Sequence, residues 1–216
     1  WLLLMEPSTV TQRQALQLGL GAGSLTKFCA KVLRLQKTTA IELNPQVLHA
    51  CRGWFKLPAD SAKMQVILAD AASAIQDPPW WGTVDALQID LYDDEAAAPV
   101  LDSAAFYADC RRLLTPEGCM TVNLFGRSSS FNRSVDRIAE AFGREAIWAF
   151  KATREGNTVV LAQRTPTRPT RAVLAARAET IQTQWGLPAV KWLRGFKPLV
   201  TLSVRQEDGA CQLGDR

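Results

Sequence analysis

The feature that most constrains this chain is a glycine-rich turn, Gly19-Leu20-Gly21-Ala22-Gly23, near its N-terminus. An apolar stretch at residues 15–20 runs into the turn, and apolar residues at helical spacing follow it, with Ser24 as the expected helix N-cap. A strand, a glycine turn and a helix in this order are typical of nucleotide-binding α/β domains. Glycine is required there because a side chain would keep the backbone away from the ligand.

The rest of the chain continues this alternation. Further strands are expected at 38–43, 64–69, 84–91 and 119–125, and two more, roughly 146–152 and 158–163, form an antiparallel hairpin. The pattern predicts an α/β, Rossmann-like fold of the methyltransferase type: a mostly parallel seven-stranded sheet with helices on both faces and an antiparallel C-terminal hairpin. We expect residues 1–165 to form this domain, and residues 166–216 to be a helical extension that packs on it, with a helix at about 171–185.

The composition excludes several kinds of chemistry. The five cysteines include no C-x-x-C pair, and His49 is the one histidine. We therefore expect reduced core cysteines, a surface histidine, no metal site and no Ser-His-Asp catalysis. The net charge is +4, and basic residues gather late in the chain, a pattern more typical of a solvated helix than of a nucleic-acid surface. With no secretory signal or membrane span expected, the predicted location is cytoplasmic, without a membrane or nucleic-acid partner.

Carboxylates stand at the ends of several predicted strands. Glu42 ends the second strand, about 20 residues beyond the turn, where an acid can accept hydrogen bonds from ribose hydroxyls. Asp70 ends the third strand and could accept a bond from an adenine amino group, and Asp90 ends the fourth. Each also has a simpler interpretation: a surface acid for Glu42, a helix N-cap for Asp70 and a loop acid for Asp90. Together with the turn they occupy the carboxyl edge of the sheet, where open α/β sheets bind their ligands.

The nature of the ligand follows from what accompanies the turn. The chain lacks a G-x-x-x-x-G-K-[ST] loop, which argues against a nucleoside triphosphate. An NAD site is the weaker alternative, since strands ending in a hairpin fit a methyltransferase-type sheet better. The turn therefore predicts a site for an adenosyl cofactor of the S-adenosylmethionine type.

An acidic segment, Asp90-Leu91-Tyr92-Asp93-Asp94-Glu95, lies at the mouth of this predicted site. Carboxylates there attract a cationic partner and can take a proton from an amine that must become a nucleophile. Asp90 is the candidate base, and Tyr92 is expected to line the pocket. Tyr107 is expected at a helix surface or core edge. Asn123 is polar within an apolar strand, so a structural hydrogen bond is expected for it.

These residues resemble the spermidine synthase (polyamine aminopropyltransferase) family over about residues 15 to 163. The resemblance rests on five segments: Leu18–Leu25, Ala40–Pro45, Leu68–Ala71, Gln88–Asp93 and Ser103–Tyr107. The last of these is similar to a Ser-x-x-Phe-Tyr helix start that general methyltransferases usually lack.

The resemblance implies a site and a reaction. It implies transfer of an aminopropyl group from decarboxylated S-adenosylmethionine to a polyamine acceptor, within a homodimer and without a metal. Asp90 would be the catalytic base, and Tyr92 and Asp93 would hold the acceptor. The residues implied in binding the donor are Gly19, Gly21, Gly23, Glu42, Leu43, Asp70, Ala71 and Asp90.

Two alternatives remain open from the sequence. The family usually has an acid at the position of Ala22, which helps to place the amine of the donor. The alanine favours a methyltransferase that uses intact S-adenosylmethionine. The second alternative is a non-catalytic relative that keeps the nucleotide pocket.

Overall fold

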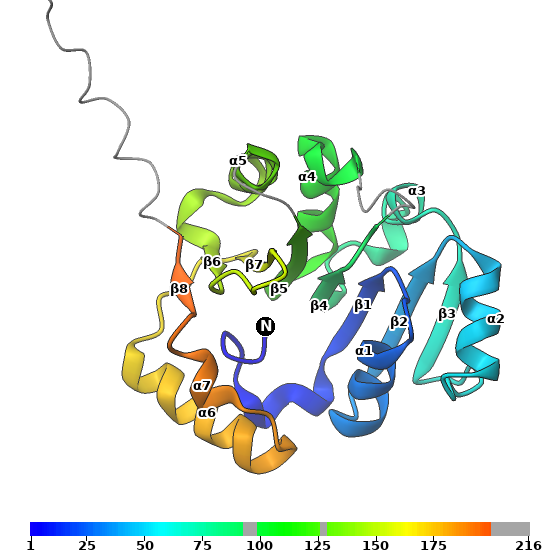
Figure 1. Cartoon of the computed structure of the whole chain (residues 1–216), viewed down its shortest axis with the longest axis horizontal. Helices are drawn as coiled ribbons and strands as arrows, with labels where there is room; N and C mark the ends of the chain where they lie inside the picture. The colour runs from blue at the N-terminus through cyan, green and yellow to red at the C-terminus, as the bar shows by residue number, and fades with distance from the viewer. Residues whose placement is uncertain (93–98, 126–128, 200–216) are drawn as a thin grey trace, which may run out of the picture.

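The computed structural model describes residues 1–92, 99–125 and 129–199. These residues build one sheet in the order β3-β2-β1-β4-β5-β7-β6-β8 (Figure 1). The strands are β1 (Gln14–Leu18), β2 (Lys37–Glu42), β3 (Met64–Leu68), β4 (Val84–Ile89), β5 (Leu114–Phe125), β6 (Ile147–Ala149), β7 (Asn157–Gln163) and β8 (Lys197–Pro198). Strands β1 to β5 pair in parallel, whereas β7 runs antiparallel to β5 and β6. This confirms the predicted Rossmann-like fold and its C-terminal hairpin.

The sheet has eight strands where seven were predicted. The additional strand, β8, pairs Lys197 and Pro198 with β6. A strand of this length carries no periodic pattern, and its proline is tolerated because it lies on the edge of the sheet.

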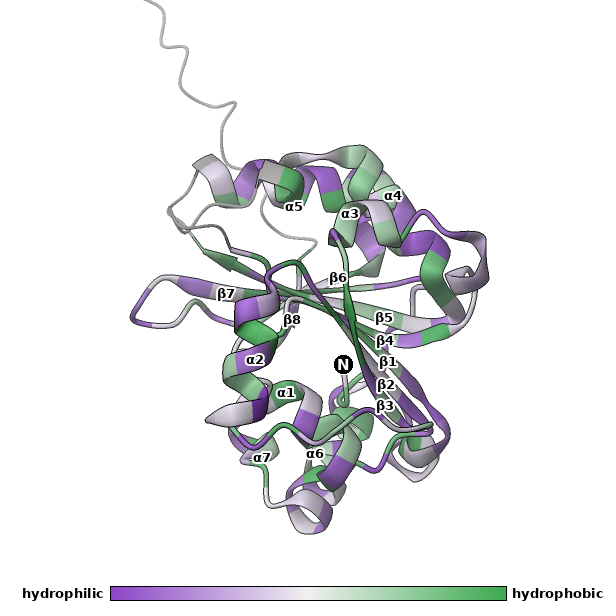
Figure 2. Ribbon diagram, turned by 90° about the vertical axis from the view of Figure 1, so that its right-hand side faces the viewer, coloured by the Kyte–Doolittle hydropathy of each residue, from purple (hydrophilic) through white to green (hydrophobic). Residues whose placement is uncertain are grey.

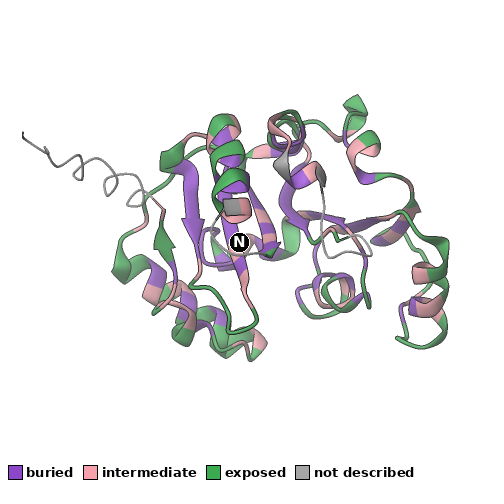
Figure 3. Cartoon of the chain, turned by 45° about the horizontal axis from the view of Figure 1, so that its top comes forward, coloured by how far each residue is buried: buried purple, intermediate pink, exposed green. Residues whose placement is uncertain are grey.

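Helices cover both faces of the sheet (Figure 2). They are α1 (Ser24–Lys27), α2 (Pro45–Gly53), α3 (Ala71–Ala74), α4 (Ala104–Leu113), α5 (Ser129–Phe142), α6 (Arg171–Trp185) and α7 (Ala189–Trp192). The largest apolar cluster packs α3, α4 and α5 on one face, and a second packs the N-terminal segment, α6 and α7 on the other. Figure 3 shows the consequence: the strands are mainly buried, while the helices expose their outer sides.

The Ser-x-x-Phe-Tyr segment starts α4. Ser103 caps the helix by accepting a hydrogen bond from the Phe106 amide, at 3.3 Å. Phe106 and Tyr107 are both buried, and Tyr107 has no exposed surface. The expectation that Tyr107 lies at a surface or core edge was therefore wrong. It shares the inward face of α4 with Cys110 and Leu113, at helical spacing.

Two predicted boundaries also differ from the structure. The N-cap of α1 is Gly23 rather than Ser24, because the chain leaves the turn with a left-handed φ of +64° at Gly23. Strand β5 begins at Leu114, whereas its predicted start was residue 119. The pairing with β4 shifts between Val84 and Ala86, so the extra residues of β5 bulge there.

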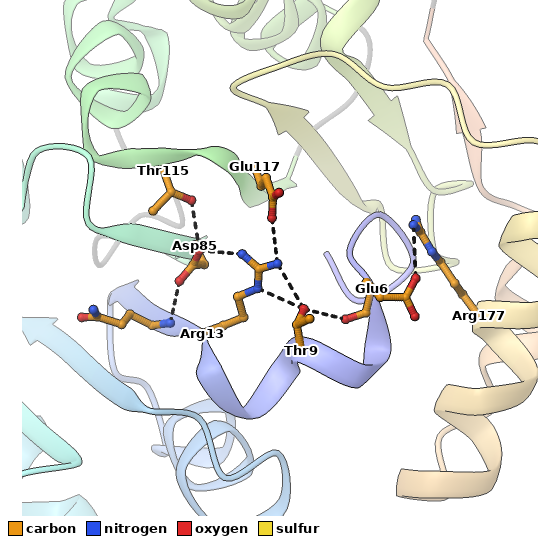
Figure 4. Close-up of polar contacts among 8 residues, drawn as sticks. Glu6, Thr9, Arg13, Asp85, Thr115, Glu117 and Arg177 are labelled. Carbon is orange, nitrogen blue, oxygen red and sulfur yellow. Dashed lines mark hydrogen bonds and ion pairs between the residues drawn. The ribbon is translucent and has the colours of Figure 1, made fainter.

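A polar network ties together the amino ends of the strands (Figure 4). We call Arg13, Gln14, Asp85, Thr115 and Glu117 the amino-edge network. The Asp85 carboxylate accepts from Arg13 Nη1 at 3.1 Å, from Thr115 Oγ1 at 3.0 Å and from the Gln14 amide at 2.9 Å. Arg13 also pairs with Glu117 at 2.8 Å. The network therefore joins β1, β4 and β5 at the edge opposite the glycine turn.

Candidate functional site

The glycine turn occupies the carboxyl edge of the sheet, between β1 and α1. Gly19 has φ +92°, and a Cβ added there would lie 2.2 Å from the Asp90 carbonyl oxygen. Its amide donates to the Ile41 carbonyl at 2.9 Å, and the Asp90 amide donates to the Leu18 carbonyl at 3.0 Å. Only glycine fits this close approach, so the turn is fixed against the ends of β2 and β4.

The middle of the turn faces open space. Gly21 has φ +52°, and a Cβ built there would meet no heavy atom within 4 Å. The Gly21 carbonyl accepts a bond from Cys51 Sγ of α2 at 2.9 Å, which holds the turn from behind. Gly23 is buried, and a Cβ there would approach a Leu57 methyl to 3.1 Å. The turn thus presents bare backbone to a ligand at the edge of the sheet.

Glu42, at the end of β2, connects this turn to the start of α2. Its Oε2 accepts from the Leu20 amide at 3.0 Å and its Oε1 from the Asn44 amide at 2.9 Å. A carboxylate oxygen can accept more than one hydrogen bond, so both oxygens retain acceptor capacity. The side chain is thus oriented in advance, and it can still bind a pair of hydroxyl groups.

Asp70 is the N-cap of α3, which was the simpler of its two predicted roles. Its Oδ1 accepts from the Ser73 amide at 2.8 Å and from Ser73 Oγ at 2.7 Å. The residue is exposed, and its second oxygen has no partner among the described residues. Ala71 follows as the first, buried residue of α3. The capping role therefore leaves one oxygen of Asp70 for a ligand.

Asp90 lies directly after β4 and is exposed. Its Oδ1 accepts from Asn123 Nδ2 on the neighbouring strand β5 at 3.1 Å. The Asn123 Oδ1 is buried and has no partner among the described residues. The Tyr92 hydroxyl donates to the Asn123 carbonyl at 3.3 Å. Asn123 therefore makes hydrogen bonds to both Asp90 and Tyr92, and its side-chain oxygen Oδ1 remains without a partner in the described structure.

Apolar side chains line the same edge. Leu43, Leu68, Tyr92 and Phe125 follow or end β2, β3, β4 and β5, and all are exposed, Leu43 by 67%. Large apolar groups exposed together beside polar groups are typical of a ligand site. Carboxylates of Glu42, Asp70 and Asp90 at this edge favour a ligand that carries positive charge.

Within the described ranges, no group of three or more His, Cys, Asp or Glu side chains is arranged to hold a metal ion. In that same part of the chain, no helix is both long and apolar enough to cross a membrane.

Comparison with known proteins identifies the family. The chain is 30% identical over 201 residues to the polyamine aminopropyltransferase of Neisseria meningitidis serogroup A, covering 91% of this chain and 73% of the relative. The chain belongs to the polyamine aminopropyltransferase family. No protein-family model matches it.

Solved structures of other proteins share the fold of this aminopropyltransferase-family chain. Human methyltransferase-like protein 13, in complex with SAH, superposes with a TM-score of 0.76 at 22% identity, covering 94% of this chain and 93% of that one. A probable spermidine synthase from Corynebacterium glutamicum gives a TM-score of 0.67 at 18% identity, covering 96% and 76%. At these identities the likeness establishes a common fold.

The structure brings most of the predicted site residues of this aminopropyltransferase-family chain to one edge. Asp93 lies outside the described residues. The structural hydrogen bond expected for Asn123 is present, but its partner is Asp90 of the site, and Leu68 and Phe125 were not predicted as site residues. A polar residue near the end of a buried strand was the one signal for Asn123, while the exposure of Leu68 and Phe125 depends on the tertiary fold.

Proposed function

We propose that the chain is an aminopropyltransferase that moves an aminopropyl group from decarboxylated S-adenosylmethionine to an amine. The observation that supports this most directly is the placement of Asp90. Its exposed carboxylate is oriented by Asn123, directly beside the glycine turn. An acceptor ammonium must lose a proton before its nitrogen can attack, so a proton acceptor at a fixed position next to a nucleotide site suits this reaction.

The residues at the edge fit the adenosyl part of such a donor. Glu42 would accept bonds from the ribose hydroxyls, since the Leu20 and Asn44 amides already orient its two oxygens. The free oxygen of Asp70 would accept a bond from the adenine amino group, and exposed Leu43 would contact the base. The bare backbone at Gly21 leaves room for the donor to lie on the turn.

The donor supplies a carbon next to a positively charged sulfur, and methylthioadenosine is the leaving group. Asp90 takes a proton from the acceptor ammonium, which frees the nitrogen lone pair. The nitrogen then bonds to that carbon while the carbon–sulfur bond breaks and its electrons go to sulfur. General-base assistance of this kind contributes about 100- to 10,000-fold to a rate. The fixed positions of Asp90 and the turn supply orientation as well.

Tyr92 has a supporting role. Partial burial of its phenol, followed by the negative charge of Asp90, raises the pKa of Tyr92 to about 12. The phenol is therefore neutral at physiological pH and acts as a hydrogen-bond donor to the Asn123 carbonyl. We propose that it positions Asn123, and through it Asp90, and that it lines the acceptor side of the site.

A paired donor assay tests the proposal. The purified protein is incubated with 1,4-diaminobutane and either decarboxylated or intact S-adenosylmethionine, and methylthioadenosine and S-adenosylhomocysteine are measured by mass spectrometry. Methylthioadenosine and spermidine from the decarboxylated donor support aminopropyl transfer. Binding of methylthioadenosine without turnover, over a panel of amines, would contradict it and favour a non-catalytic relative.

A second function, methyl transfer from intact S-adenosylmethionine, is favoured by Ala22. This residue is exposed in the turn and offers no carboxylate to the amine of a donor. Release of S-adenosylhomocysteine in the same assay, with no methylthioadenosine, would establish that alternative.

Location and assembly are also part of the proposal, by analogy with the family. We place the activity in the cytoplasm and in a homodimer. Size-exclusion chromatography with light scattering tests the assembly, since the chain has a mass of 23.8 kDa.

A further inference from the structure

A chain of buried polar side chains lies between α1 and the neighbouring strands β1 and β4. Gln17 of β1, Thr26 of α1 and Gln88 of β4 are each at most 5% exposed. Thr26 Oγ1 donates to Gln17 Oε1 at 2.5 Å, and Gln17 Nε2 donates to Gln88 Oε1 at 2.7 Å. We call these three side chains the buried polar chain. It joins one helix to two strands of the sheet.

The position of the buried polar chain in the sequence relates it to the proposed site. Gln17 stands two residues before the glycine turn and Thr26 three residues after it, so their hydrogen bond joins the two ends of the turn. Gln88 stands two residues before Asp90 and is the register partner of Gln17 in the parallel pairing of β1 with β4. The buried polar chain thus connects both ends of the turn with the strand that leads to the proposed base.

Packing alone does not require polar residues at these positions. A buried amide or hydroxyl loses its water, and apolar side chains of similar size would fill the space without that cost. Here every side-chain nitrogen and oxygen of the three residues has a partner, and Cys29 Sγ accepts from Gln88 Nε2 at 3.6 Å. A buried network that is fully hydrogen-bonded fixes its members in one arrangement. The buried polar chain therefore specifies a geometry.

Helix α1 depends on such a contact. It has four residues, and a π-helical turn at Phe28–Val32 follows it. A helix this short is held mainly by its tertiary contacts. Thr26 is the buried residue of α1, whereas Ser24 and Leu25 are exposed. The Thr26 hydroxyl therefore anchors the segment that directly follows the turn.

We infer that Gln17, Thr26 and Gln88 are positioning residues that hold the glycine turn at a fixed place relative to Asp90. The inference rests on the proposed function, in which the turn binds the donor and Asp90 takes the proton. The three side chains act through the backbone of the turn and do not contact a substrate. A displacement of about 1 Å between reacting groups can cost about 100-fold in rate, so a fixed turn contributes directly to catalysis.

Thr26→Val tests this inference, because valine keeps the shape of threonine and removes the hydroxyl. Gln17 Oε1 would then lose its partner in the interior, and the turn would lose the bond between its ends. We expect methylthioadenosine to bind ~10-fold more weakly, by calorimetry, and kcat of aminopropyl transfer to fall by ~10-fold or more. Thr26→Ser keeps the hydroxyl and should restore both quantities to within ~3-fold of wild type.

Thr38→Val is the matched control. Thr38 also has no exposed surface, but its Oγ1 has no partner among the described residues, so the same substitution removes no hydrogen bond. It should leave methylthioadenosine affinity and kcat near their wild-type values. All variants are measured below their own unfolding midpoints, so that a loss of stability alone does not lower either quantity. Wild-type affinity and kcat in folded Thr26→Val would overturn the inference.

A double variant separates one connected chain from independent structural effects. Gln88→Met breaks the chain at its other end with a side chain of similar length, and should lower kcat by ~10-fold. Losses from independent sites multiply, whereas residues that act as a unit are not additive. The double variant Thr26→Val with Gln88→Met should therefore lose no more than ~2-fold beyond the larger single loss. A double loss equal to the product of the two single losses would count against the inference.

The two proposals fail in different ways. If methylthioadenosine binds and no amine is aminopropylated, the proposed function is wrong, while the methylthioadenosine affinities of Thr26→Val and Thr26→Ser still decide whether the buried polar chain positions the turn. If aminopropyl transfer occurs and Thr26→Val equals wild type in both quantities, the proposed function stands and the positioning role falls.

Discussion

An aspartate lies at each end of β4, and the two differ in burial and in the number of their hydrogen-bond partners. Asp85, at the amino edge, is 7% exposed and accepts hydrogen bonds from Arg13, Gln14 and Thr115. Asp90, at the carboxyl edge, is exposed and accepts a single bond from Asn123 among the described residues. The same residue type on the same strand is saturated at one end and available at the other.

This difference indicates that Asp85 contributes to stability, whereas Asp90 is available for the proposed function. The partners of Asp85 neutralise it and join β1, β4 and β5 (Figure 4). Around Asp90, by contrast, an acceptor atom of Asn123 is left without a partner in the described structure, and apolar side chains are exposed. Buried polar groups normally have hydrogen-bond partners, so an acceptor without one has capacity for a further bond. The carboxyl edge therefore leaves Asp90 available to a ligand, as the proposed function requires.

The largest effect is expected for Asp90→Asn. The amide keeps the shape of the side chain but cannot take a proton, so aminopropyl transfer should fall by about 100- to 10,000-fold. Methylthioadenosine affinity should change little. Rates and calorimetric affinities are compared with those of Asp85→Asn, which should retain near wild-type turnover at a temperature where it is folded. Equal activity of Asp90→Asn and wild type would remove Asp90 from the mechanism.

Gly19→Ala tests the geometry of the carboxyl edge. The new methyl would lie 2.2 Å from the Asp90 carbonyl oxygen, at a φ of +92° that alanine avoids. The turn must move, so methylthioadenosine affinity should fall by ~100-fold or more. The strained backbone should also lower the free energy of unfolding by about 1–3 kcal/mol. Gly53→Ala is the control, because a Cβ there meets no atom within 4 Å. Wild-type ligand affinity in Gly19→Ala would show that the turn does not need this conformation.

Asp85→Asn should damage stability and spare the chemistry. It removes the charge that faces Arg13 in a largely buried pair, while Arg13 retains its exposed partner Glu117. We expect a loss of about 2–3 kcal/mol in the free energy of unfolding, below the range for a fully buried pair. Urea denaturation measures it. Glu117→Gln, which alters only the exposed pair, should cost less than about 1 kcal/mol. Similar losses in the two variants would contradict the assigned difference in burial.

The sequence predicted the carboxyl edge better than the amino edge. Each of Gly19, Glu42, Asp70 and Asp90 lies at the end of a strand or within two residues of it, so a local pattern of an apolar run and a polar residue is enough to place them. Parallel strands then bring these ends together by topology alone. The predicted residues lie at one edge because the position of each follows from its own strand and does not require a particular partner residue.

Contacts between distant segments were not predictable in this way. Arg13 and Asp85 are brought together only by the pairing of β1 with β4, and Asn123 reaches Asp90 only because β5 lies beside β4. A charged residue inside the buried strand β4 was the available signal, since a buried carboxylate requires a partner. The sequence could not name that partner. Tyr107 was misplaced for a related reason: its environment is set by the packing of α4.

The smallest effect is expected for Tyr92→Phe, and it refines the contrast at the carboxyl edge. Because the pKa of Tyr92 is raised to about 12, the phenol is neutral throughout the working range, and its loss should not change the pH profile of turnover between pH 7 and about 10. Loss of its bond to the Asn123 carbonyl should lower kcat by less than about 10-fold, in line with roughly 1 kcal/mol for such a bond.

A raised folded-state pKa contributes stability that is complete below the unfolded pKa of about 10 and is lost as pH rises toward 12. Only above about pH 10 should the unfolding free energies of wild type and variant differ in their pH dependence, measured by urea denaturation across that range. A shifted turnover profile near neutral pH would instead show that Tyr92 takes part in the proton transfer assigned to Asp90.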